Sequence, residues 1–480
     1  MIKFLLNQEV REEALLSPNM TVLNYLRTKV KKAGTKEGCG SGNCGACTVV
    51  LGEMVNGRLE YRSVNACLVL VSTLHGKQLI TVEDLQGEDR SLHPVQQALV
   101  NHHGSQCGYC TPGIIMSMFA LSKNRPQADK QDVLESLSGN LCRCTGYRPI
   151  IDAALSLSTT APYQDSFTRQ MQSTIDKLNS INNEPASLQL NNQSCFSPAT
   201  TDELAELLLA HPHARIVAGG TDLALEVTQH HREIEILVDI CRIKDMKCIN
   251  ETDHYINIGA NVPLSDCYPI LNTYFPDFGE MLRRFASLQI RNQGTLGGNI
   301  ANASPIGDTP PLLIALDASI TLRQGSDSRT IPVEDYFISY RKTELRPSEF
   351  IEKITIPKPE ANKTFHGYKN SKRIGDDISA VCGGFYIEIE ADTVISARIA
   401  FGGMAAIPKR AVNCEQSLVG HSWNLDTINT AIAALESDFV PLSDFRASKA
   451  YRQQIAANML YRYFIEQQNS HFTTRVTSYG

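Results

Sequence analysis

Residues 38–47 read Gly-Cys-Gly-Ser-Gly-Asn-Cys-Gly-Ala-Cys, and this stretch decides the fold of the N-terminal part of the chain. It spaces Cys39, Cys44 and Cys47 as C-x4-C-x2-C, and Cys67 follows further along. The residues between the cysteines are mostly small. Small residues let backbone N–H groups turn toward the sulfur atoms and stabilise negative charge there. The stretch therefore predicts a loop whose thiolates hold an inorganic group.

The spacing of these cysteines indicates which group they hold. A [2Fe–2S] cluster takes four thiolates, and C-x4-C-x2-C followed by a distant cysteine is the plant-type spacing. Zinc is the alternative, but a glycine-rich gap of four residues is unusual for zinc, which usually takes two paired knuckles. We therefore predict a [2Fe–2S] cluster on Cys39, Cys44, Cys47 and Cys67.

Short β-like runs separated by glycine turns surround this loop. Residues 2–6, 48–51 and 59–64 have the composition of strands, and residues 22–27 are typical of an amphipathic helix. Residues 1–75 are therefore expected to form a small α+β domain, a ferredoxin-like β-grasp.

A second cysteine group follows in a different setting. Cys107 and Cys110 form a C-x2-C pair, and Cys142 and Cys144 form a C-x-C pair. On spacing alone, this group fits zinc, a thioredoxin-type redox pair or a second cluster. Each pair adjoins a predicted helix, so four thiols can converge from two loops.

Helical periodicity dominates the chain around the second group. Residues 94–103, 113–123, 130–138 and 149–157 each show it, with Pro or Gly at several breaks. Residues 76–157 are therefore expected to form a compact four-helix domain.

The bulk properties are those of a soluble globular protein. The chain has 480 residues, 42% hydrophobic and 20% charged residues, and a formal net charge of -6. That length predicts about two to four domains. The charge balance favours neither nucleic acid nor an anionic membrane as a partner. No stretch approaches the roughly 20 apolar residues that cross a bilayer, and acidic residues come too early for a signal peptide, so a cytoplasmic location is expected.

The remaining chain divides by composition. Residues 158–194 are rich in Ser, Thr, Asn and Gln and are expected to be a linker, with one helix near Phe167 to Leu178. Residues 195–365 mix strands and helices, and residues 366–480 begin with β-rich sequence and end in helices. Six further cysteines are scattered, and we interpret them as core or surface thiols.

Two glycine loops lie in the third segment. Residues 216–222 read Ile-Val-Ala-Gly-Gly-Thr-Asp, and residues 295–299 read Thr-Leu-Gly-Gly-Asn. Glycine pairs let backbone N–H groups approach a pyrophosphate closely. Neither loop is the Rossmann G-x-G-x-x-G, and each taken alone fits a plain turn as well.

Together these motifs resemble one known family. Residues 38–47, 106–113 and 139–147 are similar to the iron–sulfur portion of the molybdenum hydroxylases, which include xanthine dehydrogenase, aldehyde oxidase and carbon monoxide dehydrogenase. The resemblance implies that Cys107, Cys110, Cys142 and Cys144 hold a second [2Fe–2S] cluster. It extends over the glycine loops to the FAD-binding domain and to a C-terminal flavoprotein domain. A multidomain α+β fold is thereby expected.

The resemblance also implies the residues that contact cofactors. Gln106 would touch the pterin of the partner's cofactor, and residues 372–377 would lie beside the flavin with Tyr340 nearby. The mixed charge of that loop suits an anionic dinucleotide, because Arg373 can pair with a pyrophosphate, so Tyr340 and Arg373 are expected to face NAD+. A solvated surface turn is the alternative for the loop that contains Arg373. Core packing is the alternative for Phe285, which would otherwise lie against the isoalloxazine ring. The FAD contacts implied are Ile216, Val217, Ala218, Gly219, Gly220, Thr221, Asp222, Phe285, Thr295, Gly298, Asn299, Asp308, Ile351 and Lys369.

The order of domains on one chain is similar to that of the small subunits of bacterial xanthine dehydrogenases. It implies that electrons pass from a large molybdopterin-binding partner through the two clusters to FAD and then to NAD+ during purine hydroxylation. It implies further a heterotetramer of two small and two large chains. Aldehyde or N-heterocycle oxidation, a stand-alone flavin–iron–sulfur reductase, and a zinc-containing scaffold stay open as alternatives.

Overall fold

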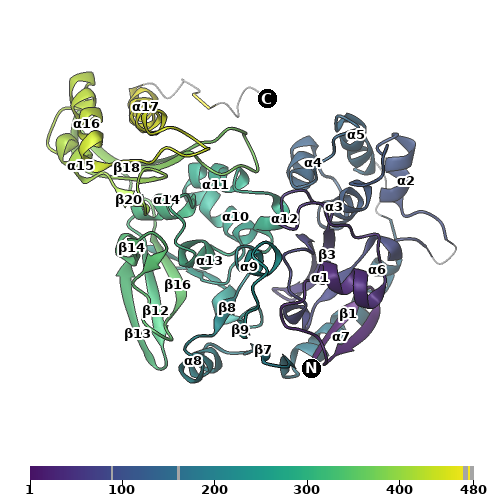
Figure 1. Cartoon of the computed structure of the whole chain (residues 1–480). Helices are drawn as coiled ribbons and strands as arrows, with labels where there is room; N and C mark the ends of the chain where they lie inside the picture. Colours follow the sequence, from purple (N-terminus) through teal and green to yellow (C-terminus); the bar gives the residue numbers. More distant parts are fainter. Residues whose placement is uncertain (88–89, 159–162, 469–473, 476–480) are drawn as a thin grey trace. The chain divides into compact units, whose positions relative to one another are not determined.

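The computed structural model describes residues 1–87, 90–158, 163–468 and 474–475 (Figure 1). The chain forms two compact units. The first is Met1–Lys244 together with Ser287–Gly294, and the second is Asp245–Ala286 together with Thr295–Gly480. We describe each unit by itself.

The first unit begins with a five-stranded sheet in the order β2-β1-β5-β3-β4. Strand β1 pairs in parallel with β5 and antiparallel with β2, as in a β-grasp. The expected helix is short and continues as a wider π-type turn over Tyr25–Val30. The elements are β1 (Ile2–Leu6), β2 (Glu9–Glu13), α1 (Val22–Asn24), β3 (Thr48–Val55), β4 (Arg58–Asn65) and β5 (Gln78–Ile80).

Four helices follow, as predicted. Each begins at a recognisable start signal: proline occupies the first turn of α2, α3 and α5, and Asp129 caps α4. Phe119 of α3 is fully buried at the centre of their core. The helices are α2 (Pro94–Asn101), α3 (Thr111–Asn124), α4 (Lys130–Leu137) and α5 (Arg148–Leu157).

The stretch expected to be a linker is more ordered than its composition indicates. It contains α6 (Ser166–Arg169), α7 (Met171–Asn182) and β6 (Ala186–Leu190). Phe167 is buried and packs edge-on against Phe119, with ring centroids 5.5 Å apart. Sparse apolar side chains at helical spacing thus anchor a polar segment on the domain core.

A four-stranded sheet in the order β6-β7-β9-β8 completes the first unit. Strand β9 pairs in parallel with β7 and β8, so the loop after β8 lies at the carboxyl end of these strands. The further elements are β7 (Gln193–Ser197), α8 (Thr201–Ala210), β8 (Arg215–Val217), α9 (Leu223–Thr228), β9 (Ile236–Asp239) and α12 (Leu288–Arg291).

The second unit opens with a five-stranded antiparallel sheet in the order β10-β11-β16-β12-β13, and a small hairpin joins β14 to β15. Its strands are β10 (Ile249–Glu251), β11 (Tyr255–Gly259), β12 (Ser319–Gln324), β13 (Asp327–Pro332), β14 (Phe337–Ser339), β15 (Lys342–Thr343) and β16 (Phe350–Pro357). The helices are α10 (Leu264–Tyr274), α11 (Pro276–Arg283), α13 (Leu296–Ala301) and α14 (Thr309–Ala315).

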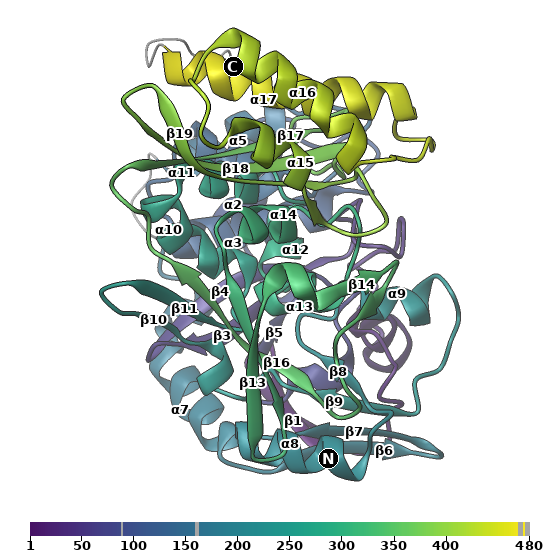
Figure 2. The same cartoon turned by 90° about the vertical axis from the view of Figure 1, so that its left-hand side faces the viewer.

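An antiparallel sheet in the order β17-β18-β19-β20 follows, and helices α16 and α17 lie side by side across it (Figure 2). These elements are β17 (Lys363–Asn370), β18 (Val381–Glu390), β19 (Thr393–Gly402), β20 (Lys409–Arg410), α15 (Val412–Leu418), α16 (Leu425–Asp438) and α17 (Lys449–Gln468). The predicted multidomain α+β class is confirmed.

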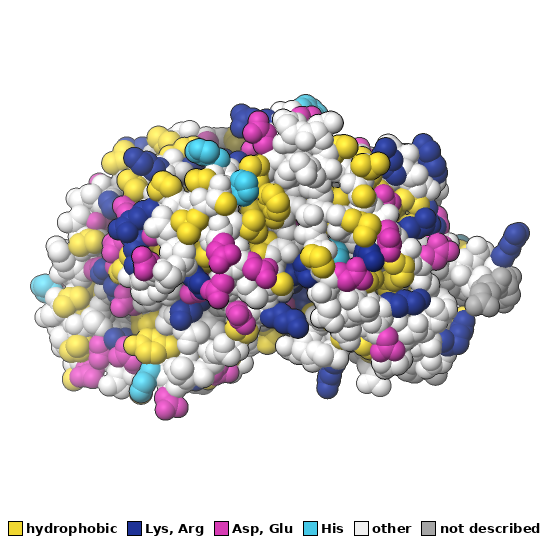
Figure 3. All heavy atoms as spheres, turned by 90° about the horizontal axis from the view of Figure 1, so that it is seen from below, with side chains coloured by type: hydrophobic (Ala, Val, Ile, Leu, Met, Phe, Trp, Pro, Cys, Tyr) yellow, Lys and Arg dark blue, Asp and Glu magenta, His cyan; other side chains and the backbone are white. Residues whose placement is uncertain are grey.

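The surface carries mixed charge. In the face drawn in Figure 3, basic and acidic side chains are interspersed with apolar ones, in keeping with the small net charge of -6. Among the residues described, no helix is both long and apolar enough to cross a bilayer.

A buried histidine joins the ferredoxin-like sheet to α7. His75 Nδ1 accepts a hydrogen bond from the Lys3 N–H at 3.1 Å, and Nε2 donates to the Ile181 carbonyl at 2.9 Å. The bond to Nδ1 requires the neutral ring, because a protonated imidazole has no acceptor nitrogen. Burial, with the positive charge of Arg242, lowers the pKa of His75 below its ordinary value of 6.5.

Acidification should therefore weaken the docking of α7. As the pH falls through 6.5, the unfolded chain binds a proton that the folded chain does not. The contribution of His75 is complete above that pH and declines below it, by at most about 1.4 kcal/mol per pH unit. Amide hydrogen exchange in α7, corrected for intrinsic rates, should show this loss between about pH 7.5 and 5.5.

His75→Gln is the informative variant, because glutamine keeps one acceptor and one donor but does not titrate. Its α7 should show a smaller loss of protection on acidification, whereas the exposed His421→Gln control should behave as the wild type. An unchanged pH dependence in His75→Gln would show that another group is responsible.

Candidate cofactor sites

The first cysteine group lies in the loop before β3 and at the end of β4, and its thiols are arranged in two pairs. Contact with Cys44 lowers the pKa of Cys39, and the same contact raises the pKa of Cys44. Cys47 and Cys67 form the second pair, which is buried, and Cys67 lowers the pKa of Cys47. Each pair thus holds one thiol that favours the thiolate form.

Backbone N–H groups point at the first pair, as the small residues in this loop predict. The N–H groups of Ser41 and Asn43 lie 3.4 and 3.3 Å from Cys39 Sγ. Asn65 at the end of β4 stabilises the loop, because its side-chain amide donates to the Gly42 carbonyl at 3.0 Å. Such donors stabilise negative charge on cluster sulfur.

The second group is also arranged in pairs. A backbone hydrogen bond from Tyr109 and contact with Cys144 lower the pKa of Cys107. Cys110, at the start of α3, lies against Cys142, and burial together with that contact raises its pKa to about 12. Cys142 is further bound by the Thr145 hydroxyl at 3.1 Å. Two loops of the helical domain therefore bring four thiols together.

The donor set of each group fits a [2Fe–2S] cluster. Such a cluster has two irons, each taking two thiolates, and the four thiols of each group lie as two pairs.

The two cysteine loops are in direct backbone contact. The Leu141 N–H, next to Cys142, donates to the Cys44 carbonyl at 3.0 Å. Gly45 has a φ of +69°, and a Cβ on it would lie 2.2 Å from the Gly139 carbonyl oxygen. Only glycine permits both the conformation and the close approach.

The first glycine loop follows β8 and packs against the first cysteine loop. A Cβ on Gly219 would lie 1.9 Å from the Gln293 carbonyl oxygen. The Gln293 side chain accepts from the Asn65 N–H at 3.3 Å and donates to the Gly219 carbonyl at 3.4 Å. The glycine loop thus lies close to the chain after β4, which contains Cys67.

The second glycine loop begins α13 in the other unit. Thr295 caps the helix, and its hydroxyl accepts from the Gly298 N–H at 3.0 Å. Asn299 accepts from the Thr309 hydroxyl at 2.6 Å. These predicted FAD contacts therefore share one helix and its cap.

Asp308 and Lys369 form a buried ion pair in the same unit, with Lys369 Nζ 2.6 Å from Asp308 Oδ2. Ser379 donates to the other carboxylate oxygen at 2.5 Å, and Lys369 Nζ also donates to the Arg284 carbonyl at 3.2 Å. Phe285, the next residue, is half-buried, and Ile351 is buried on β16. The structure brings Lys369 and Asp308 together at the end of α11.

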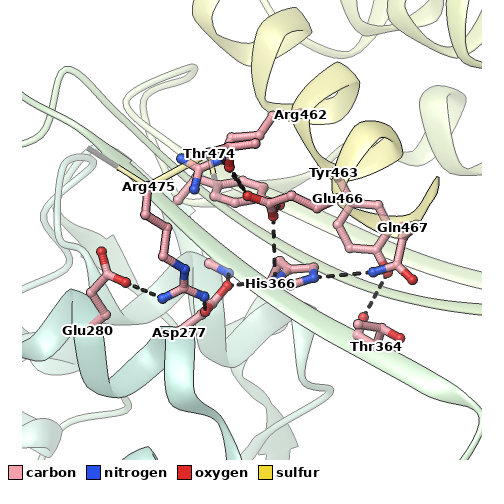
Figure 4. A network of polar contacts seen from close by, with 12 residues as sticks. Asp277, Glu280, Thr364, His366, Arg462, Tyr463, Glu466, Gln467, Thr474 and Arg475 are labelled. Carbon is pink, nitrogen blue, oxygen red and sulfur yellow. Dashed lines mark hydrogen bonds and ion pairs between the residues drawn. The ribbon is translucent and has the colours of Figure 1, made fainter. Parts of the chain in front are cut away.

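A polar network holds α11 against β17 and α17 (Figure 4). His366 Nδ1 lies 2.7 Å from Asp277 Oδ2, and Gln467 is hydrogen-bonded to the other ring nitrogen. Arg475 forms ion pairs with Asp277 and Glu280. This network fixes the start of α11, and the Lys369 contact fixes its end.

The remaining predicted residues are exposed. Gln106 lies beside Cys107, and Tyr340, 62% exposed, lies in the turn between β14 and β15. The Arg373 N–H donates to Asp377 at 2.9 Å, and its guanidinium donates to the Asp376 carbonyl at 2.9 Å.

Sequence reasoning missed the amide side chains that join the loops. Asn65, Asn140, Gln229, Gln289 and Gln293 each bind backbone or side-chain groups of another loop. They follow no spacing pattern, and only the fold identifies their partners.

Comparison with known protein families identifies four domains. Residues 6–72 match the 2Fe-2S iron–sulfur cluster binding domain, and residues 81–155 match the [2Fe-2S] binding domain. Residues 188–359 match the FAD binding domain in molybdopterin dehydrogenase, and residues 366–467 match the CO dehydrogenase flavoprotein C-terminal domain.

Similar whole proteins include xanthine dehydrogenase 1 of Arabidopsis thaliana, 31% identical over 93% of this chain. Xanthine dehydrogenase/oxidase of Rattus norvegicus is 30% identical over 96% of it. The chain spans 38% of the length of these relatives.

Two solved structures are similar to more than half of this chain. Carbon monoxide dehydrogenase from Hydrogenophaga pseudoflava has a TM-score of 0.54 and 27% identity, over 57% of this chain and 96% of that one. Quinoline 2-oxidoreductase from Pseudomonas putida 86 has a TM-score of 0.53 and 25% identity, over 58% and 97%. With its four domain matches in the order that the motifs predict, the chain belongs to the molybdenum hydroxylase family and carries its two [2Fe–2S] domains and its flavoprotein domains.

Proposed function

We propose that this chain is the electron-transfer component of a xanthine dehydrogenase, acting between a molybdopterin-bearing partner and NAD+. The observation that carries the proposal is the arrangement of eight thiols in two groups of two pairs each, joined by a backbone hydrogen bond, with a flavin-type glycine loop beside the first group. When bound, the clusters supply one-electron steps and the flavin joins them to a two-electron exchange.

The residues of the chain set the order of the sites. Cys107, Cys110, Cys142 and Cys144 would hold one cluster, and the Leu141–Cys44 hydrogen bond joins that loop to the other four ligands. A Cβ on Gly220 would lie 3.6 Å from the Leu68 carbonyl, next to Cys67. The first cysteine loop therefore stands between the second loop and the glycine loop.

The flavin would be held by the two glycine loops together with Asp308, Lys369, Ile351 and Phe285. Backbone N–H groups of these loops suit a pyrophosphate. Lys369, already paired with Asp308, offers one buried cation whose position is fixed.

The partner would dock where the second cysteine loop is exposed. Gln106 lies there with Tyr109 and Leu141, which are 48% and 46% exposed, so apolar surface adjoins the predicted pterin contact. We infer a large molybdopterin-binding chain, two of which would assemble with two copies of this one. Xanthine is favoured because the relatives that align over nearly the whole chain are xanthine dehydrogenases.

NAD+ would approach the loop that follows Lys369. Lys372 and Arg373 are exposed and can pair with a pyrophosphate. Asp376 and Asp377 hold Arg373 in place through its backbone and its guanidinium.

The cluster assignment is tested by Cys107→Ala. The wild-type chain should contain about four irons and show two paramagnetic signals on reduction. The variant should lose one signal and keep the other, because Cys39, Cys44, Cys47 and Cys67 are untouched. The exposed Cys248→Ala is the matched control and should keep both. Loss of both signals from a folded variant, or of neither, would contradict the assignment, and a colourless wild type would indicate structural zinc.

Gly298→Val tests the flavin site. A Cβ at this position would lie 2.8 Å from the Thr295 hydroxyl and would obstruct the backbone approach to a pyrophosphate. The protein should lose most of its flavin and keep its iron, measured by absorbance and metal analysis. Gly375→Val adds the same side chain in open space and should keep both. Unchanged flavin content in Gly298→Val would place the flavin elsewhere.

Arg373→Glu tests the acceptor. Loss of one charge-assisted hydrogen bond should raise the KM for NAD+ by about tenfold or more, and reduction of a small neutral dye should be nearly unchanged. Lys449→Glu makes the same charge change at an exposed position of the same unit and should leave both unchanged. Equal effects of Arg373→Glu on both acceptors would show that Arg373 acts on the fold or on electron transfer within the chain. The absence of any effect would show that the loop is a plain surface turn.

A further inference from the structure

Gln229 lies directly after α9, the helix that begins where the first glycine loop ends. Its side-chain amide reaches the first cysteine loop. Nε2 donates to the Gly40 carbonyl at 3.0 Å and lies 3.3 Å from the Cys39 carbonyl. Two carbonyl oxygens face the same amide group, so the NH2 end and not the oxygen must point toward the loop.

One of these carbonyls belongs to a peptide that contacts a predicted ligand. The Gly40 carbonyl and the Ser41 N–H are the two ends of a single peptide group. The Ser41 N–H lies 3.4 Å from Cys39 Sγ. Gln229, this peptide group and the Cys39 sulfur therefore form a chain of two hydrogen bonds. In such a chain each bond polarises the next and strengthens it.

The loop conformation is adapted to this contact. Gly40 has a φ of +63°, and a Cβ on it would lie 3.1 Å from Gln229 Nε2. A larger residue would crowd the amide and strain the backbone. The turn thus presents the carbonyl to Gln229 while its other end presents the N–H to sulfur.

We propose that Gln229 is a positioning residue that raises the reduction potential of the cluster held by Cys39, Cys44, Cys47 and Cys67. It does so by strengthening the Ser41 N–H donation to the Cys39 sulfur, which stabilises the more negative, reduced state of the cluster. This inference rests on the proposed function, since it requires a cluster on these cysteines. A residue directly after α9, the helix that follows the first glycine loop, would thus set the reduction potential of the first cluster.

The test is a redox titration of the full chain followed by paramagnetic resonance, with Gln229→Leu compared with the wild type. Leucine fills similar space and donates no hydrogen bond. At any fixed potential, the reduced-to-oxidised ratio of the first cluster should fall about threefold, which is roughly 28 mV for a one-electron couple. The potential of the second cluster should not move.

Gln229→Lys separates polarisation from mere packing. Lysine restores a donor and adds positive charge, so the first-cluster potential should equal or exceed that of the wild type. Gln172→Leu removes an exposed amide that bonds within α7, to Asp176 at 2.9 Å, and should leave both potentials unchanged.

An unmoved first-cluster potential in Gln229→Leu would overturn the proposal, and so would equal shifts of both clusters, which indicate general loosening. Absence of any iron–sulfur signal in the wild type would instead contradict the cluster sites themselves. Failure of the inference and failure of the proposed function are thereby distinguished.

Discussion

The full hydrogen bonding of one buried amide is the constraint on which the iron–sulfur portion depends. Asn140 is 2% exposed, and its Nδ2 donates to the Gly45 carbonyl and the Thr48 hydroxyl, both at 3.1 Å. Its Oδ1 accepts from Ser117 at 2.6 Å and from Gln289 at 2.9 Å. Two protons and two lone pairs are all that an asparagine side chain offers. Any displacement of one partner would leave a buried polar group unsatisfied, at a cost of about 1–3 kcal/mol.

This amide explains why the two cysteine loops keep a fixed separation. Asn140 lies two residues before Cys142 and binds the residue after Cys44, while the next N–H, that of Leu141, binds Cys44 itself. The backbones of the two loops approach closely where glycine permits contact at Gly45 and Gly139. Folding of one domain thereby completes the environment of the other.

The cysteine spacing, the four helices and the β-grasp strands were predictable because each follows from a local pattern: thiol intervals, periods of 3.6 and 2, and proline at helix starts. Helices α6 and α7 were harder to predict in full because their buried apolar residues, Phe167, Leu178 and Ile181, are few among polar ones. The amides at 65, 140, 229 and 293 could not be predicted at all. A single Asn or Gln has no periodicity, and its role arises when distant loops meet.

The pairing of Asp308 with Lys369 was likewise outside the reach of the sequence. Both residues were predicted to contact a flavin. They lie 61 positions apart in the chain, and they form a buried ion pair with each other. A buried pair of this kind is weak support for stability but fixes geometry well. It holds a cation in place at the end of α11 while the network around His366 holds the other end of that helix.

The short segment Ser287–Gly294 has a consequence for how the protein is made. It belongs to the first unit, although the chain on both sides of it belongs to the second. The side chain of Gln289, for example, donates a hydrogen bond to Ser117, which lies 172 positions earlier in the chain. During synthesis from the N-terminus, the first 244 residues leave the ribosome with this part of their core still open. The first unit therefore finishes folding only after part of the second unit has been synthesised. Folding of the first unit cannot be completed by its own N-terminal 244 residues.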